Sequence, residues 1–247
     1  MAQNIQAISD TALRIEWPDD VSLDLNDKIV HFCSKLLKNT IPGVEEWVPA
    51  YKSVTIYYLP HIITYRELVN EVQRILEISE STIKHPKKRR IISVPVYYGG
   101  DSGPDLKRVA TINNIREDEV VKRHQDAEYI VYMLGFLPGF PYLGGLDNAI
   151  ATPRLEKVRQ KTPEGSVGIA FQQTGIYPAT SPGGWNIIGK TPLSLINAHK
   201  QSAFLFQAGD KVHFYEITYD TFRAIKQEVE ASKYNVWKHI REENAHL

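Results

Sequence analysis

Glycine, proline and aromatic residues crowd the sequence GFLPGFPYLGGLD at 135–147 and the sequence ATPRLEKVRQKTPEGSVGIAFQQTGIYPATSPGGWNIIGKTP at 151–192. Proline fixes φ and removes a backbone donor, whereas glycine permits positive φ and the close approach of another backbone. Aromatic residues stand between them, among them Phe136, Phe140, Tyr142, Tyr177 and Trp185. The pattern predicts a fixed path of turns. These turns form the corners of a small β-barrel plugged by aromatic rings, or they carry a binding site, and the two interpretations are compatible.

Strand signals on both sides of these stretches are short and closely spaced. After Glu128 we expect strands at Tyr129–Leu134, Val167–Phe171, Gly175–Pro178, Asn186–Gly189, Phe204–Phe206 and Lys211–Thr218. Many short strands separated by Gly, Pro, Asp and Ser predict an all-β barrel or sandwich. A strand at Ile91–Tyr98 precedes them, and a helix capped by Asp220 follows, ending near Ser232.

The first ninety residues alternate strand and helix signals. Residues 5–17 predict a strand or strand pair, and the helical period that starts at Leu25 predicts an amphipathic helix. Ser53–Leu59 is rich in β-branched and aromatic residues and predicts a strand. Thr64 and Glu67 have the spacing of a capping box ahead of a second helix. This half of the chain therefore mixes helices and strands.

The basic run HPKKRR at His85–Arg90 separates the two halves. Such a run is typical of a solvated loop, and its alternative is an anion or polynucleotide site. The predicted fold class is α+β, with an N-terminal α/β sandwich domain over 1–90 and a β-barrel domain with a C-terminal helix over 91–235. A polar tail over 236–247 is expected to be frayed.

Composition bounds the class of protein. The 247 residues carry 29 basic and 29 acidic side chains, so nucleic acid and anionic membrane are not expected as partners. Cys33 is the single cysteine, which excludes an intrachain disulfide. The N-terminal sequence has no secretory signal, and no apolar run approaches the roughly 18 residues that span a bilayer. We expect a cytoplasmic protein.

Two motifs match nucleotide- or DNA-binding patterns without their context. Gly184–Thr191 fits G-x-x-x-x-G-K-[ST], but Trp185 and two isoleucines inside the motif predict strand, and Pro192 follows directly. A helix beginning at Asp105 and a second at Glu117–His124 resemble a helix-turn-helix, but no recognition helix rich in Arg, Asn or Gln follows. A hairpin strand and two small packing helices are the simpler interpretations.

The chain offers no complete catalytic set by spacing alone. Its eight histidines include no pair at the i, i+4 or His-x-His spacing of a metal site, so no metal is expected. His124 is the candidate acid, base or ligand anchor, and its alternative role is a cationic cap at the end of a helix. Ser166, Ser181 and Thr174 lie among glycines, but none is in a G-x-S-x-G elbow.

Polar side chains in the glycine-rich loops suit a small ligand that carries a carboxylate or amide, because Arg binds carboxylates bidentately and Gln matches amides. These side chains are Arg154, Arg159, Lys161, Glu164, Gln172, Gln173, Thr174, Ser181 and Asn186.

Three blocks in register resemble the family of 5-oxoprolinase B subunits, which includes the sporulation kinase inhibitor KipI and proteins named allophanate hydrolase subunit 1. The blocks are VPVYYGGDSGPDL at Val94–Leu106, YMLGFLPGFPYLGGL at Tyr132–Leu146 and GSVGIAFQQTGIYPATSPGGWNIIGKTPL at Gly165–Leu193. The resemblance implies that the barrel is cyclophilin-like and that the P-loop match is accidental.

The resemblance also implies an activity. Such proteins act with two partners, the A and C subunits, as an ATP-hydrolysing amidohydrolase that opens 5-oxo-L-proline to L-glutamate. Related sequences form part of biotin-dependent urea carboxylases, but the biotin-accepting A-M-K-M tetrapeptide is absent from this chain. ATP is the expected cofactor, held by this chain or by a partner, and the chain is expected to be inactive alone.

We expect thirteen residues to line a site shared with a partner subunit. They are His124, Phe136, Pro138, Gly139, Phe140, Tyr142, Gln173, Thr174, Tyr177, Ser181, Gly183, Gly184 and Trp185. Alanine at Phe140 or Trp185 is expected to abolish reconstituted activity without loss of expression. The alternative function is that of a KipI-like module that binds a sensor histidine kinase and blocks its autophosphorylation. A third interpretation, prolyl isomerase, rests on fold similarity alone.

Overall fold

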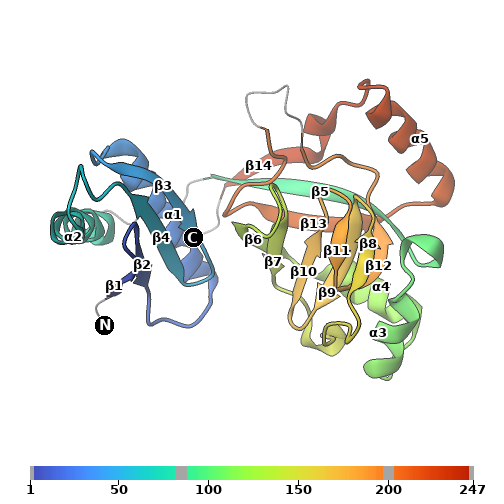
Figure 1. Ribbon diagram of the computed structural model, residues 1–247. Coiled ribbons are helices and arrows are strands. Elements are labelled where there is room, and N and C mark those ends of the chain that lie inside the picture. Colours follow the sequence, from blue (N-terminus) through green and yellow to red (C-terminus); the bar gives the residue numbers. More distant parts are fainter. Residues whose placement is uncertain (1–2, 82–87, 197–202, 245–247) are drawn as a thin grey trace. The chain divides into compact units, whose positions relative to one another are not determined.

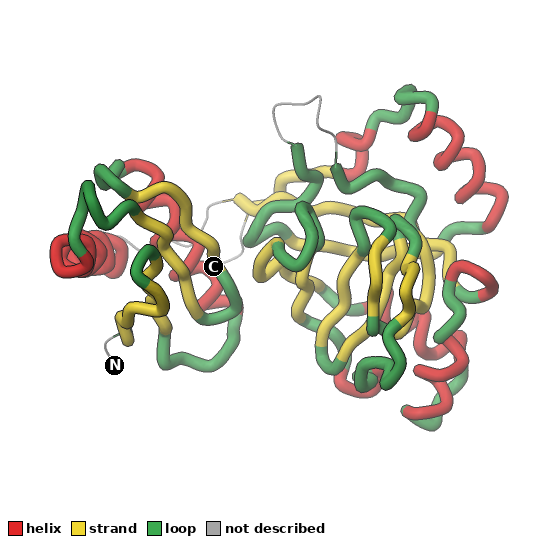
Figure 2. The backbone as a smooth tube through the Cα atoms, in the orientation of Figure 1, coloured by secondary structure: helices red, strands yellow, loops and turns green. Residues whose placement is uncertain are grey.

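The computed structural model describes residues 3–81, 88–196 and 203–244, which divide into two compact units (Figure 1). Unit 1 contains the described residues 3–81, and unit 2 contains the described residues of Lys88–Asn244. Within the basic run, residues 85–87 lie outside the described ranges, and Lys88 already begins the first strand of unit 2. The strands of unit 2 curl round one another, and most helices of that unit lie outside them (Figure 2).

Unit 1 is a four-stranded antiparallel sheet covered by two helices. The strand order is β1-β2-β4-β3. The bounds are β1 Asn4–Ser9, β2 Ala12–Glu16, β3 Val44–Pro49, β4 Ser53–Tyr58, α1 Leu23–Lys38 and α2 Tyr65–Ser81. Leu13 and Ile56 of the sheet belong to the same buried cluster as Phe32 of α1 and Val72 of α2. Apolar residues at every second strand position and at the helical period therefore meet in one core.

The predicted capping box at the start of α2 is confirmed. The backbone N–H of Thr64 donates to Glu67 Oε2 at 2.9 Å, and the N–H of Glu67 donates to Thr64 Oγ1 at 3.3 Å. Each side chain thus satisfies a backbone donor that the first helical turn leaves free.

Unit 2 is a closed barrel of seven strands. The order is β12-β9-β10-β7-β6-β13-β5, and pairing of β12 with β5 closes the ring. The bounds are β5 Lys88–Tyr98, β6 Tyr129–Leu134, β7 Pro141–Gly144, β9 Ser166–Ala170, β10 Gln173–Ile176, β12 Asn186–Lys190 and β13 Lys211–Glu216. β13 runs parallel to β5, and the other barrel pairs are antiparallel. These findings confirm the predicted α+β class with a β-barrel.

Further elements surround the barrel. They are β8 Arg159–Thr162, β11 Ser181–Gly183, β14 Ile240–Asn244, α3 Leu106–Ile112, α4 Glu117–Asp126, α5 Tyr219–Glu230 and the short helices η1 Gly100–Ser102, η2 Asn148–Ile150 and η3 Val236–His239. Figure 1 shows α3 and α4 at one end of the barrel, where Val109 and Val120 enter the barrel core. The two helices therefore pack against the barrel, which is the simpler of the two interpretations of their sequence. No described helix is long and apolar enough to cross a membrane.

Two sequence-based expectations are corrected. The polar tail is not separate from the barrel, because its residues Ile240–Asn244 form β14 and pair with β5. β5 is eleven residues long, so its edge has room for both β14 and β12. Phe204–Phe206 is not a strand and keeps only a single bridge, from Phe204 to Ile196. The interpretation of the P-loop match as a strand is confirmed, because most of Gly184–Thr191 lies in β12, an extended strand that cannot wrap a phosphate.

Candidate functional site on the outer face of the barrel

Five aromatic side chains gather on the outside of the barrel around Phe140. Ring centroids of Tyr142, Tyr177, Trp185 and Phe136 lie 4.9, 5.2, 5.4 and 5.7 Å from that of Phe140. Most of these pairs are edge-to-face, the arrangement that the ring quadrupole favours. We call these five residues the outer aromatic cluster. The sequence names all five as site residues, and the structure brings them together.

Strand alternation separates this cluster from the barrel core. Ile176 of β10 points into the core, so Gly175 and Tyr177 face outward. A Cβ at Gly175 would lie 2.9 Å from the Phe140 ring, so the ring covers the strand only because residue 175 has no side chain. Gly183 has the same role beside Tyr177. A Cβ at residue 183 would lie 2.4 Å from the Tyr177 hydroxyl, so the tyrosine fits only because residue 183 has no side chain.

The rim of the cluster exposes apolar side chains. Phe136, which belongs to the cluster, is 61% exposed. Phe171 is 58% exposed and follows Ala170, which is buried with Phe140; Val158 is 56% exposed, and its Cγ2 lies 3.6 Å from a Cβ placed at Gly184, the residue before Trp185. Phe136 and Phe171 also have positive φ, +66° and +54°, a conformation that costs free energy for residues other than glycine. Exposed aromatic rings held on strained turns are typical of a surface that another molecule covers.

Arg154 supplies positive charge beside the cluster. It is exposed, and it forms no ion pair with any residue that the structure describes. Burial raises the pKa of the Tyr142 and Tyr177 phenols, and the Arg154 charge acts in the opposite direction on both. Arg154 is therefore close to both rings and available to an anionic group.

His124 and Thr174 lie inside the barrel. His124 Nδ1 is 2.8 Å from the hydroxyl of Tyr98, and its Nε2 is 3.0 Å from Thr174 Oγ1. Thr174 donates its own proton to the carbonyl of Gly168, so it accepts from Nε2–H and leaves Nδ1 to accept from Tyr98. Burial lowers the pKa of His124 to about 3. The ring is therefore neutral, and its interpretation as a cationic helix cap is wrong.

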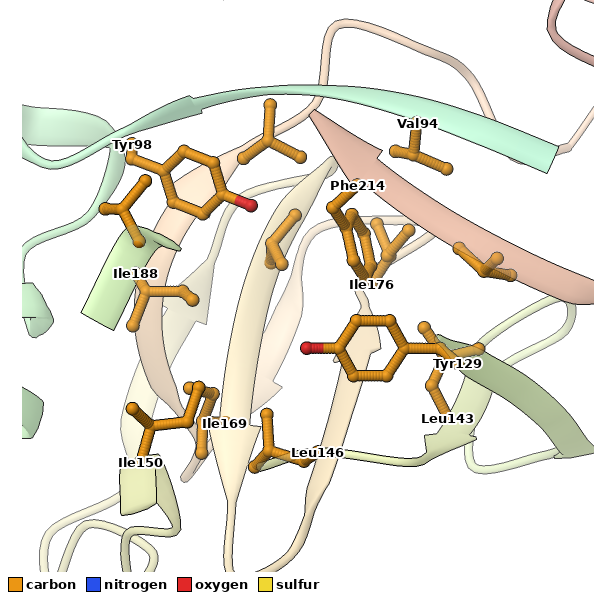
Figure 3. Packing of buried hydrophobic residues seen from close by; sticks show 14 of the residues in the cluster. Val94, Tyr98, Tyr129, Leu143, Leu146, Ile150, Ile169, Ile176, Ile188 and Phe214 are labelled. Carbon is orange, nitrogen blue, oxygen red and sulfur yellow. The ribbon is translucent and has the colours of Figure 1, made fainter. Parts of the chain in front are cut away.

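Figure 3 shows part of the barrel core, including Tyr98 and Tyr129, whose hydroxyls both contact His124. The hydroxyls of Tyr98 and Tyr129 point inward among Val94, Ile176 and Phe214. The Tyr129 hydroxyl donates to the carbonyl of His124 at 2.9 Å. His124 thus joins the polar groups that the barrel buries, and we assign it a structural role.

The other predicted site residues surround the cluster at different depths. Pro138 is exposed and Gly139 is buried in the same turn, while Gln173 is half-buried at the start of β10. Ser181 and Gly183 lie on β11, which pairs with β8, and Gly184 leads to Trp185. Among the residues that the structure describes, the His, Cys, Asp and Glu side chains form no group of three or more that could hold a metal ion.

Sequence reasoning missed a clamp that holds the Trp185 loop. Asp105 is 6% exposed; its Oδ1 accepts from Arg159 Nη2, and its Oδ2 accepts from the N–H of Ile187 at 2.7 Å. Arg159 Nη1 also donates to the carbonyl of Trp185 at 3.4 Å. Residues 105, 159 and 187 are far apart in sequence, so no spacing could have predicted the contact.

Replacing Asp105 with asparagine is expected to lower the free energy of unfolding by about 2 kcal/mol, because one oxygen becomes a donor and either Arg159 or the Ile187 N–H loses its acceptor. Urea denaturation measures the change. Asp101→Asn is the matched control, since the Asp101 carboxylate is exposed. Equal stability of the two variants would contradict the clamp.

Comparison with known proteins identifies the family. The family model described as carboxyltransferase domain, subdomain C and D, matches residues 3–206. The chain is similar to the 5-oxoprolinase B subunit of Bacillus subtilis strain 168, with 41% identity over 236 residues covering 91% of this chain and 97% of that protein. It is also similar to the 5-oxoprolinase B subunit of Escherichia coli O157:H7, with 38% identity covering 84% and 93%.

Solved structures share the fold. A structure of TTHA0988 superposes with a TM-score of 0.73 at 31% identity, covering 84% of this chain and 40% of that one. The present chain thus spans about two fifths of that protein's length. The Kluyveromyces lactis urea carboxylase superposes with a TM-score of 0.78 at 19% identity, covering 98% of this chain and 24% of that one. At that identity the likeness concerns the fold alone.

The fold and the matched family model define a carboxyltransferase domain of the subdomain C and D class. Within that class, the chain belongs to the family of 5-oxoprolinase B subunits. This assignment confirms the resemblance of the three sequence blocks.

Proposed function

We propose that this chain is the B subunit of an ATP-dependent 5-oxoprolinase, which converts 5-oxo-L-proline to L-glutamate in a complex with two partners, the A and C subunits. The observation that carries the proposal is the 41% identity to a 5-oxoprolinase B subunit over nearly the full length of both chains. We place this complex in the cytoplasm. The kinase-inhibitor alternative has no support among the relatives described above.

The outer aromatic cluster supports a composite site. Its rim combines exposed apolar rings with an available cation, so it suits a partner surface that encloses a small carboxylate ligand. Arg154 would bind the carboxylate of 5-oxoproline, and the rings would exclude water from the lactam. ATP hydrolysis supplies the driving force that a stable five-membered amide needs. Because His124 is neutral and enclosed, the reacting acid and base are expected to come from a partner.

Reconstitution tests the proposal. The purified chain is mixed with its candidate partner subunits, and ADP release that depends on 5-oxoproline is measured. We expect turnover in the mixture and none with this chain alone. Turnover by the partners without this chain, or silence in every folded combination, would contradict the proposal.

Two substitutions at the rim are expected to reduce the activity of that complex. Arg154→Ala should raise the KM for 5-oxoproline about tenfold, because a charged hydrogen bond to a carboxylate contributes about 1.5–3 kcal/mol. Phe136→Ala should weaken assembly or kcat/KM by about tenfold, as expected for an interface aromatic. Both residues are exposed, so neither change should unfold the chain.

Matched controls lie in unit 1. Arg66→Ala removes an exposed arginine of α2, and Leu37→Ala removes an apolar side chain of α1 that is 71% exposed. Both variants are expected to keep wild-type kinetics. If the rim variants and the controls behave alike, the site does not lie on the outer aromatic cluster.

A further inference from the structure

A second cleft in unit 2 lies apart from the centre of the outer aromatic cluster. Its walls are the turn at 99–104, β8, the end of β12 and the first turn of α5, and its volume is about 670 Å³. Pockets of about 300–1,000 Å³ are typical of small-molecule sites. The chain therefore has room for a ligand here in addition to the one proposed above.

One side of this cleft is cationic. Arg159, Lys161 and Lys190 line it, and Arg159 is fixed in place by Asp105. Neither lysine forms an ion pair with a described residue. Lys190 is half-buried, and this desolvation lowers the pKa of its ammonium. The nearby charge of Lys226 lowers that pKa further, to a smaller extent, whereas the charges of Glu164 and Glu230 raise it. A partly desolvated ammonium next to two other cations gains from an anionic ligand.

The other side is aromatic. The Tyr97 ring lies 5.4 Å from that of Tyr219 and 6.2 Å from that of Phe222, and all three residues line the cleft. Tyr219 is 52% exposed, so part of its ring is open to a ligand. Aromatic side chains of this kind stack against planar heterocycles such as nucleic-acid bases.

We propose that this cleft binds a nucleoside polyphosphate, with the base against Tyr97 and Tyr219 and the phosphates toward Arg159, Lys161 and Lys190. Cations alone would suit any small anion, but the aromatic wall and the volume favour a ligand that joins anionic and planar parts. Asp101 is the acidic residue among those that line this cleft, and its carboxylate suits the Mg²⁺ that accompanies such a nucleotide.

The proposal rests on the proposed function in identifying the nucleotide as ATP, and it assigns ATP to this chain. Lys190 belongs to the sequence that matches a P-loop, but it acts here through its side chain at the end of a strand. Arg159 connects the cleft to the outer aromatic cluster, because the same guanidinium contacts the Trp185 carbonyl.

Direct binding to the purified full chain tests the proposal. Calorimetric titration with the non-hydrolysable analogue AMP-PNP and Mg²⁺ is expected to show one saturable site. Lys190→Ala should weaken binding about tenfold, and Lys161→Ala, which removes an exposed side chain, by about threefold to tenfold. The matched control is Lys122→Ala on α4, which lies outside the cleft and should bind like wild type.

Two competitors place the ligand within the cleft. Inorganic tripolyphosphate should displace AMP-PNP from wild type and do so less well from Lys190→Ala, whereas adenosine should displace it weakly. Absence of saturable binding at millimolar AMP-PNP, or unchanged binding in both lysine variants, would overturn the proposal. Tripolyphosphate that fails to compete would also overturn it.

The reconstituted complex separates this proposal from the proposed function. If the Lys190→Ala complex turns over with an unchanged KM for ATP, the nucleotide site is wrong while the oxoprolinase function stands. If the wild-type chain binds AMP-PNP but its complex never acts on 5-oxoproline, the function is wrong while the site stands.

Discussion

Alanine in place of Phe140 is expected to lower the free energy of unfolding of unit 2 by about 3–5 kcal/mol, because the change leaves a cavity at the centre of the outer aromatic cluster. The Phe140 ring is 1% exposed and contacts four other rings of that cluster. The ring also covers Gly175, where no other side chain can fill the space. Urea denaturation followed by circular dichroism measures the loss.

Phe136→Ala is the matched control, since it removes the same ring from the rim of the same cluster. Because the Phe136 side chain is 61% exposed, this substitution should lower the free energy of unfolding by less than about 1 kcal/mol. A Phe140 variant as stable as the Phe136 variant would show that the cluster tolerates the cavity, which would contradict the packing described above.

The burial of Phe140 changes how its substitution is interpreted. From the sequence, alanine at Phe140 or Trp185 is expected to remove activity without affecting expression. The structure buries both side chains, at 1% and 5% exposure, so loss of activity in these variants would report loss of packing as well. Phe136 and Arg154 test the chemistry of the site more directly, because both are exposed.

The parts of the fold that the sequence predicts are those set by local periodicity. The helix from Leu23, the capping box at Thr64 and the strands of the barrel each leave a pattern within a short window. The strands β8 and β11 leave none, because they are very short, and β11 contains Pro182. The strand β14 is equally hidden, since charged residues dominate its sequence IREEN.

The features of the candidate site also differ in whether a local sequence pattern predicts them. Five aromatic residues in one glycine-rich region predict a cluster, and the structure brings them together. Contacts between distant segments are not encoded in any local pattern, so neither the Asp105–Arg159 clamp nor the cleft beside Lys190 could be predicted. Histidine is often reactive, so the sequence makes His124 a candidate, but its burial depends on Tyr98 of β5 and Thr174 of β10, two strands far from α4 in the sequence.

Acid is expected to destabilise this protein through His124. The pKa of the imidazole is lowered from 6.5 to about 3 by burial, so between these values the unfolded chain binds a proton that the folded chain does not. Stability therefore falls as pH falls. Through His124 alone, the free energy of unfolding decreases by about 2 kcal/mol from pH 7 to pH 5, and by about 4 kcal/mol from pH 7 to pH 3. Tyr98 and Tyr129, whose pKa values burial raises, stay neutral throughout.

Urea denaturation of wild type and His124→Gln at pH 5 and pH 7 isolates this effect. Glutamine keeps a donor and an acceptor but does not titrate, so the variant should be less stable at pH 7 and should lose about 2 kcal/mol less than wild type on acidification. The difference between the two proteins is needed because other groups titrate in the same range. Burial raises the pKa of Asp210 to about 6, which favours the folded state as pH falls. Equal pH dependence in both proteins would mean that His124 takes up a proton in the folded barrel, and the tautomer fixed by Tyr98 and Thr174 would then be wrong.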